Sequence, residues 1–197
     1  MFQFFMKPRE MLTNKLIHSK YLSAYKQKFL NENQKVVFTM GNWDMVHIGQ
    51  MRYLTEVKKL GGLLIVGVFD NNTVRKKKGA NKPILDEWIR AESLCFLNVV
   101  DYVIIVSSKS YINIIKTLKP NIFVSTKEDY VQDYRNSDEF KEVMSYGGEF
   151  VIKDRESLYV SAAQIAKRVI GAQFAEVLKE YLNESESPVK ERFVKNS

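Results

Sequence analysis

The stretch VVFTMGNWDMVHIGQMRYL, residues 36–54, decides the predicted fold. It opens with a continuous apolar run rich in branched residues, which is typical of a strand buried on both faces of a parallel sheet. Gly41 then marks a turn, and from Met51 onward apolar residues recur at three-residue spacing, which predicts a helix. His47, one of the two histidines of the chain, lies in the corner between the turn and the helix.

The same alternation of strand-like and helix-like segments continues along the chain. Apolar runs predict four further strands, at residues 63–69, 102–106, 122–125 and 149–153. Amphipathic patterns between and after them predict further helices, at residues 86–100 with Asp86 as N-cap, 110–119, 137–146 and 161–170. The alternation predicts an α/β fold, a Rossmann-like doubly wound parallel sheet of about five strands with helices on both faces.

The sequence divides into three regions. Residues 1–34 are predicted to form an N-terminal extension, with an amphipathic helix over residues 10–34. Residues 35–171 hold the alternating pattern and are predicted to form the main domain. Residues 172–197 are predicted to form a helix and a mobile tail, separated from the main domain by Gly171.

Composition limits the classes of partner. The apolar fraction of 45% and charged fraction of 27% are ordinary for a globular protein, and the net charge of +7 favours anionic ligands. A single cysteine excludes an intramolecular disulfide. No stretch reaches the roughly 20 apolar residues of a membrane span or has a signal-peptide pattern. We expect a cytoplasmic protein with no membrane span, and no nucleic-acid partner, since only charge and the basic run at residues 75–78 suggest one.

The corner after the first core strand is suited to phosphate. Ligands of open α/β sheets bind where the carboxyl ends of strands meet helix N-termini, which offer unpaired N–H groups and partial positive charge. Gly41 and Gly49 allow the backbone to approach a ligand, and His47 can donate a hydrogen bond to a phosphoryl oxygen. Neither a GxGxxG nor a GxxxxGK[ST] pattern follows the strand, which disfavours a dinucleotide site and a P-loop.

The segment GNWDMVHIGQMRYL, residues 41–54, resembles the GxFDxxHxGHxxxL signature of the cytidylyltransferase-like nucleotidyltransferases. Trp43 stands where the signature has Phe, Asp44 and His47 match, and Gln50 replaces the second His. The resemblance extends over about residues 15–171, and within the family it is strongest to the heptose adenylyltransferases. It includes the segments KVVFTMG, LGGLLIVGVFDNN, VVDYVI, LKPNIFV and YGGEFV.

The resemblance implies a set of site residues. His47, Lys78 and Gln50 are expected in catalysis, and no residue is expected to bind a metal directly. The expected nucleotide contacts are Thr39, Gly41, Trp43, Asp44, His47, Gly49, Gln50, Arg90 and Ser161. The expected contacts with the second substrate are Lys82, Asp129 and Tyr130.

The resemblance further implies transfer of AMP from ATP to a sugar 1-phosphate, with heptose 1-phosphate favoured and pyrophosphate released. Mg²⁺ is expected to be bound through the nucleotide phosphates, and a homo-oligomer, with a dimer favoured, is expected. Two alternatives stay open. One is a cytidylyltransferase that uses CTP and a small alcohol phosphate. The other is a catalytically impaired nucleotide-binding or scaffolding protein, because Gln50 cannot carry a positive charge and Ala162 and Ala163 replace two hydroxyl donors of the family.

Overall fold

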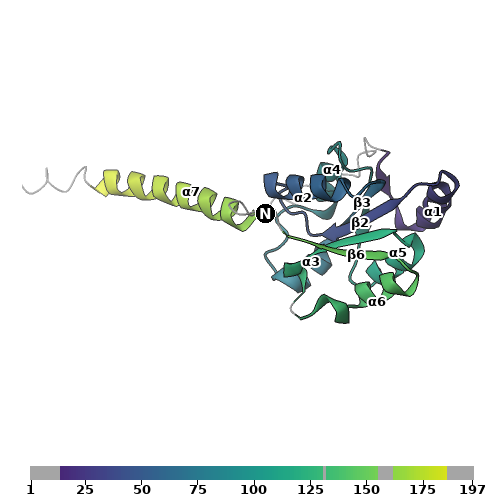
Figure 1. The fold of residues 1–197 in the computed structure, drawn as a ribbon. Coiled ribbons are helices and arrows are strands. Elements are labelled where there is room, and N and C mark those ends of the chain that lie inside the picture. The colour runs from purple at the N-terminus through teal and green to yellow at the C-terminus, as the bar shows by residue number, and fades with distance from the viewer. Residues whose placement is uncertain (1–13, 131, 155–161, 186–197) are drawn as a thin grey trace, which may run out of the picture. The chain divides into compact units, whose positions relative to one another are not determined.

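The computed structural model describes residues 14–130, 132–154 and 162–185. The first two ranges form an α/β fold (Figure 1). Six parallel strands form one sheet in the order β1-β4-β3-β2-β5-β6. The strands are β1 Leu16–Ile17, β2 Val36–Gly41, β3 Leu63–Phe69, β4 Tyr102–Val106, β5 Ile122–Thr126 and β6 Glu149–Lys153. The five predicted strands and the predicted fold class are confirmed.

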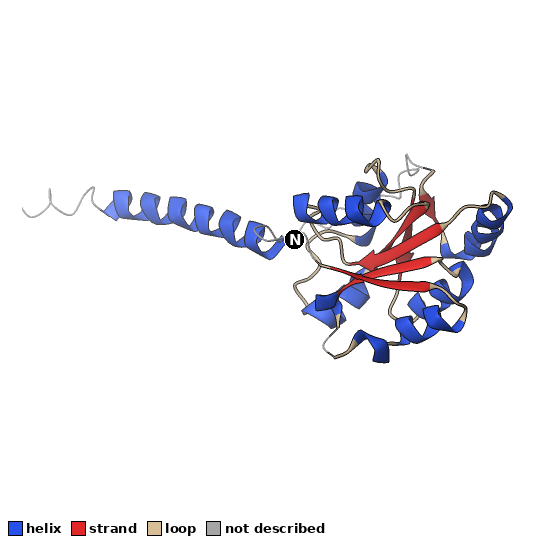
Figure 2. Cartoon of the chain, viewed as in Figure 1, coloured by secondary structure: helices blue, strands red, loops and turns tan. Residues whose placement is uncertain are grey.

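Helices of the first part of the chain flank the red strands in Figure 2. They are α1 Leu22–Asn31, α2 Ile48–Lys58, α3 Asn71–Lys78, α4 Glu87–Cys95, α5 Tyr111–Leu118 and α6 Asp138–Ser145. Three short 3-10 helices join them, η1 Ser19–Tyr21, η2 Lys127–Asp129 and η3 Tyr134–Asn136. A further helix, α7 Ala162–Ser185, belongs to a separate unit of the chain. The Asp86 side chain accepts a hydrogen bond from the Trp88 N–H, as expected of the predicted N-cap of α4.

Two apolar layers cover the sheet. Side chains of α2 and α4, such as Leu54 and Leu94, pack on one face. Side chains of α1, α3, α5 and α6, such as Phe29 and Ile115, pack on the other. Both faces of the central strands are therefore buried, which explains why their sequences are continuous apolar runs.

Strand β2 lies at the point where the winding of the sheet changes direction. It pairs with β3 on one side and with β5 on the other. From β2 the chain builds outward through β3 and β4, and it later returns to build β5 and β6. Clefts of doubly wound folds form at such a switch point, outside the carboxyl ends of the strands. The turn that follows Gly41 occupies this position.

The predicted helix over residues 10–34 is wrong for the residues that precede Leu22 in the described part of the chain. Residues 10–13 lie outside the described part, Leu16–Ile17 form strand β1, and α1 begins only at Leu22. The cause is tertiary pairing. The Val103 N–H donates to the Lys15 carbonyl at 2.9 Å, and Ile17 is buried against the core, so the segment becomes a sixth strand along β4.

The basic run at residues 75–78 forms the end of helix α3. Asp70 caps this helix by accepting from the Thr73 N–H at 2.7 Å, and Val74 anchors it in the core. The basic side chains therefore project from the last turn of α3, where the negative end of the helix dipole favours positive charge.

The chain divides into two compact units, residues 1–158 and residues 159–197. Within the second unit, α7 runs without interruption from Ala162 to Ser185, so the predicted break at Gly171 is wrong. One glycine inside a helix costs only about 1 kcal/mol, which the helix formers around it outweigh. Among the described residues, no helix is long and apolar enough to cross a membrane.

Candidate active site

The turn between β2 and α2 is tightly folded. Trp43 and Met45 both adopt positive φ, 52° and 51°, which allows the chain to reverse within a few residues. His47 follows in an extended conformation as the N-cap of α2. This turn brings Asn42, Asp44 and His47 together at the carboxyl edge of the sheet.

Trp43 forms the floor of the turn. Its indole Nε1–H donates to the Gly67 carbonyl of β3 at 2.9 Å, and only 6% of the residue is exposed. A Cβ at Gly41 would come within 3.2 Å of the Trp43 ring, so a residue without a side chain suits this position. Trp43 therefore packs beneath the turn and links it to strand β3.

Asp44 ties the turn to the segment that precedes α4. Its two carboxylate oxygens accept from the Ile84 N–H at 2.9 Å and the Leu85 N–H at 3.0 Å. The residue is only 9% exposed. Hydrogen bonds to a carboxylate are among the stronger ones in proteins, so the segment before α4 is held firmly against the turn.

Arg90 is fully buried behind the turn. Its guanidinium donates to the Leu85 carbonyl at 2.9 Å, to the Asn42 carbonyl and to the Asn71 side-chain oxygen at 2.9 Å. Burial lowers the pKa of Arg90, and nearby Asp44 opposes this change. Arginine keeps its charge in proteins. Arg90 therefore connects three segments of the chain around the corner, two through backbone carbonyls and one through the Asn71 side chain.

The Thr39 hydroxyl also points inward. It lies 2.9 Å from the Tyr53 hydroxyl of α2, and Thr39 is 1% exposed. This contact joins β2 to α2 beneath the corner.

The first turn of α2 leaves backbone donors open. Helices often satisfy such N–H groups with a side-chain oxygen of the N-cap residue, but the N-cap of α2 is His47, which has no side-chain oxygen. Among the described residues, no group accepts a hydrogen bond from the Ile48 or Gly49 N–H. Two such N–H groups at the positive end of a helix are suited to contact with an anion.

The His47 imidazole lies beside these donors. Its Nδ1 is buried and finds no hydrogen-bond partner among the described residues. Burial lowers the pKa of His47, so the ring is neutral near pH 7. An orphaned buried N–H is rarer than an orphaned acceptor, so we infer that the proton resides on Nε2. A neutral Nε2–H can donate to a phosphoryl oxygen.

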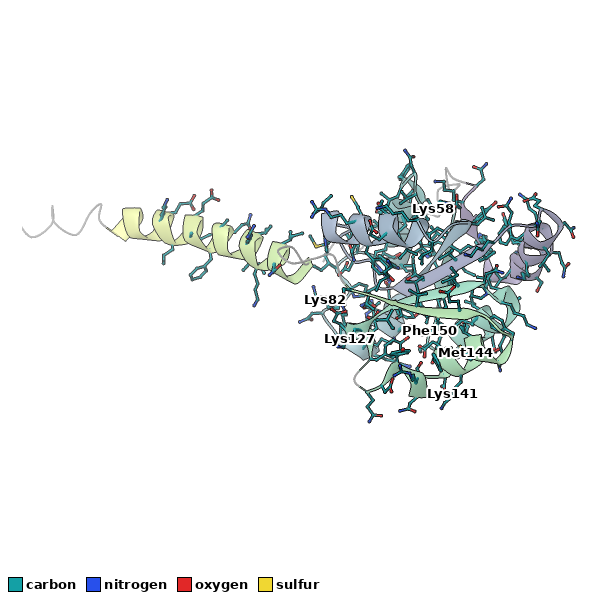
Figure 3. The ribbon with its side chains drawn as sticks, in the orientation of Figure 1. Lys58, Lys82, Lys127, Lys141, Met144 and Phe150 are labelled. Atoms are coloured by element: carbon teal, nitrogen blue, oxygen red, sulfur yellow. The ribbon has the colours of Figure 1, made fainter. Side chains whose placement is uncertain are left out.

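The remaining predicted residues lie around the corner on other elements. Lys78 is the last residue of α3 and is exposed, and Lys82 is partly buried in the following loop. Figure 3 labels Lys82 and Lys127 on the side of the sheet where the strands end. Ser161 lies outside the described residues.

Asp129 and Tyr130 follow β5. The Asp129 carboxylate accepts from the Thr126 hydroxyl at 2.7 Å, so it caps the short helix η2. Tyr130 is partly buried near the Tyr134 and Phe150 rings, and this burial raises the pKa of its hydroxyl. Tyr130 therefore stays protonated and can serve as a neutral hydrogen-bond donor.

Within the described ranges, no three His, Cys, Asp or Glu side chains converge as a metal site. The Asp44 oxygens are both engaged by backbone N–H groups, and Asp70 caps α3. A divalent ion at this corner would therefore depend on ligand phosphates and water for its oxygen ligands.

Sequence reasoning missed three residues of the corner, Asn42, Asn71 and Tyr53. The Asn42 side-chain oxygen is buried and has no partner among the described residues. The Asn71 amide connects Arg90 to Asp86. Asn42 could have been noticed because it lies inside the motif, but the partners of Asn71 and Tyr53 depend on chain segments that only folding brings together.

The sequence pattern of the cytidylyltransferase-like family matches residues 38–187, which is more than half of the chain. The chain belongs to this family. The cytidylyltransferase-like match begins within β2 and includes the whole corner from Gly41 to Gln50.

Curated relatives support this membership. The bifunctional protein HldE of Helicobacter pylori strain P12 is 37% identical over 152 residues, which cover 76% of this chain and 31% of that protein. HldE of Geobacter metallireducens is 36% identical over 115 residues, covering 58% of this chain and 23% of that protein. The chain thus spans about a third or less of these relatives.

A solved structure has the same fold. The lipopolysaccharide core biosynthesis protein of Thermoplasma volcanium is 28% identical, with a TM-score of 0.53. The similarity covers 62% of this cytidylyltransferase-like chain and 98% of that one. The shared region therefore amounts to nearly the whole of the smaller protein.

Proposed function

We propose that this chain is a nucleotidyltransferase that transfers AMP from ATP to a sugar 1-phosphate, heptose 1-phosphate being the favoured acceptor, and releases pyrophosphate. The observation that carries the proposal is the start of α2. There two free N–H groups, of Ile48 and Gly49, lie next to the neutral His47. Membership of the cytidylyltransferase-like family supports the reaction class. The resemblance of residues 15–171 to heptose adenylyltransferases supports the acceptor.

The reaction needs no protein nucleophile. An ionised oxygen of the sugar phosphate attacks the α-phosphorus of the nucleotide and forms a new P–O bond. The bond from the α-phosphorus to the bridging oxygen breaks, and pyrophosphate leaves with the electron pair. The protein then acts by holding the two substrates in line and by stabilising negative charge at the α-phosphate.

The residues of the corner divide this work. In the proposal, His47 Nε2–H and the N–H groups of Ile48 and Gly49 donate to the nucleotide phosphates. Lys78 supplies positive charge near the leaving group. Arg90 and Asp44 are positioning residues, because their hydrogen bonds hold the turn and the segment before α4 together.

Mg²⁺ enters this proposal as part of the substrate. The ion would arrive bound to the nucleotide phosphates, because the carboxylates of the corner are already engaged by backbone donors. Bound in this way, Mg²⁺ neutralises part of the charge on the phosphates. Lys82, Asp129 and Tyr130 are proposed to contact the acceptor.

A pyrophosphate-release assay with heptose 1-phosphate tests the proposal. We expect release with ATP, and a rate about 10²–10³-fold lower in His47→Ala, the usual effect of removing a donor to a developing oxyanion. Release with CTP and glycerol 3-phosphate instead would establish the cytidylyltransferase alternative. No pyrophosphate with either nucleotide across a panel of sugar and alcohol phosphates would refute the transferase.

Gln50 favours a second candidate, a nucleotide-binding protein without turnover. A neutral amide stands where the family signature has a histidine, so one group able to carry positive charge is missing. This candidate predicts that ATP or CTP binds and that no product forms. Gln50→His would then gain measurable pyrophosphate release, whereas the favoured proposal predicts release in the unmodified protein.

A further inference from the structure

Helix α7 carries a row of apolar side chains along one side. Ile170, Phe174 and Val177 follow each other at spacings of four and three residues, and Leu178 lies beside this row. Such spacings place side chains on one face of a helix. All four residues are exposed, and Phe174 is 68% exposed. We call these four residues the apolar seam of α7.

The apolar seam is a face that α7 cannot bury by itself. In this second unit of the chain, residues 167–180 are all exposed. Most of the stability of a helix in a protein comes from packing of its apolar face against another surface. We therefore expect the seam to be covered, and the charges beside it indicate by what.

The charged residues of α7 are distributed unevenly along the helix. Lys167 precedes Ile170 by three residues, so it stands in line with the apolar seam. Further along the exposed stretch, acidic residues outnumber basic ones, with Glu176 and Glu180 against Lys179. The face that carries the seam is thus basic where it begins and mainly acidic toward its other end.

This order of charges fits a second copy of the same helix in one direction only. A copy running in the same direction would bring the Lys167 side chains of both copies together within the contact, where like charges repel. A copy running in the opposite direction brings Lys167 to the acidic end of the other helix. A lysine in line with an apolar seam can specify how two helices align. Charge complementarity therefore favours an antiparallel pair.

We propose that two copies of the chain associate through α7, with their apolar seams packed against each other as an antiparallel helix pair. The two-fold axis passes between Ile170 and Phe174, so that Phe174 of each copy packs on Ile170 of the other. Lys167 then lies across from Val177 of the second copy and extends its ammonium group to Glu180 there. Because both copies use the same surface, the contact closes on itself and produces a dimer.

Sedimentation velocity of the full chain tests the surface. We expect a monomer–dimer equilibrium with a Kd within about 5–200 µM. Phe174→Gln removes the aromatic ring from both copies and should raise this Kd at least about thirtyfold. Val169→Gln is the matched control, because Val169 is exposed but lies about 100° around the helix from Ile170. It should change the Kd by no more than about threefold.

An exchange of charges tests the direction of the pair. In the antiparallel arrangement, Lys167→Glu sets an acid against the acidic end of the other helix and should raise the Kd at least about tenfold. Adding Glu180→Lys to the same chain should restore the Kd to within about threefold of the unmodified protein. In a parallel pair, Lys167→Glu would only replace one like-charge contact with another and leave the Kd unchanged.

Three results would overturn the proposed surface. They are an unmodified chain that stays monomeric up to about 200 µM, a dimer that Phe174→Gln weakens no more than Val169→Gln does, and a fall in the Tm of Phe174→Gln that is independent of protein concentration. The last result would mean that the seam packs on its own chain. A dimer that is weakened by Phe174→Gln and unaffected by Lys167→Glu would overturn the antiparallel direction.

Discussion

The guanidinium of Arg90 donates a hydrogen bond to the backbone carbonyl of Asn42, 48 residues earlier in the chain. The same buried side chain also reaches Leu85 and Asn71, so one residue of α4 fixes the turn after β2, the start of α3 and the entrance to α4. The loops that surround the candidate site are therefore held by a charged side chain that is itself inaccessible to solvent.

Removing the Arg90 guanidinium is predicted to cost about 3–5 kcal/mol of unfolding free energy. Arg90→Met keeps most of the apolar stem, but it leaves three partly buried acceptors without this donor. Urea unfolding measures this loss. Arg52→Met, an exposed position of α2, should change stability by no more than about 0.5 kcal/mol. Equal effects in the two variants would contradict the clamping role.

Asp44→Asn is predicted to destabilise the protein by about 1.5–3 kcal/mol. The carboxylate accepts from two backbone N–H groups, whereas an amide offers one oxygen and directs its NH₂ group at the second donor. Chemical denaturation checks the prediction, with Glu32→Gln, which removes an exposed acid, as the matched control. A loss no greater than that of the control would mean that the two bonds contribute little.

Gly67→Ala tests the packing between β2 and β3. A Cβ at this position would lie 2.8 Å from the Met40 Cβ and 3.1 Å from the Val106 Cγ2, so the strands would have to shift. We expect a loss of about 1–3 kcal/mol in unfolding experiments. Gly171→Ala, which meets no atom within 4 Å, should be neutral or stabilising. A neutral Gly67→Ala would show that the sheet adjusts freely.

His47 is predicted to make the folded protein sensitive to acid. Burial lowers its pKa below the ordinary value of 6.5, so between the two values the unfolded chain binds more protons than the folded one. Stability therefore falls as the pH drops below about 6.5. Urea midpoints at pH 7.5 and 5.5 should differ less in His47→Ala than in the unmodified protein. An identical difference in both proteins would argue against a lowered pKa.

The sequence by itself determined the strand–turn–helix corner. Residues 36–54 contain the apolar run, the glycines and the histidine that such a corner needs, and these signals are local. The residues expected to contact phosphate at this corner are close in sequence, so His47, Gly49 and Gln50 could be predicted as a group before folding was considered. Family resemblance then gave the expected chemistry.

Only the tertiary structure decided what holds that corner. Arg90 and Thr39 were expected to contact nucleotide, yet the structure buries both and pairs them with protein groups. Leu16–Ile17 became a strand because β4 offered an unpaired edge. Each of these contacts joins residues that are far apart in the sequence. The spacing of apolar residues within one segment does not tell which distant segment it will contact.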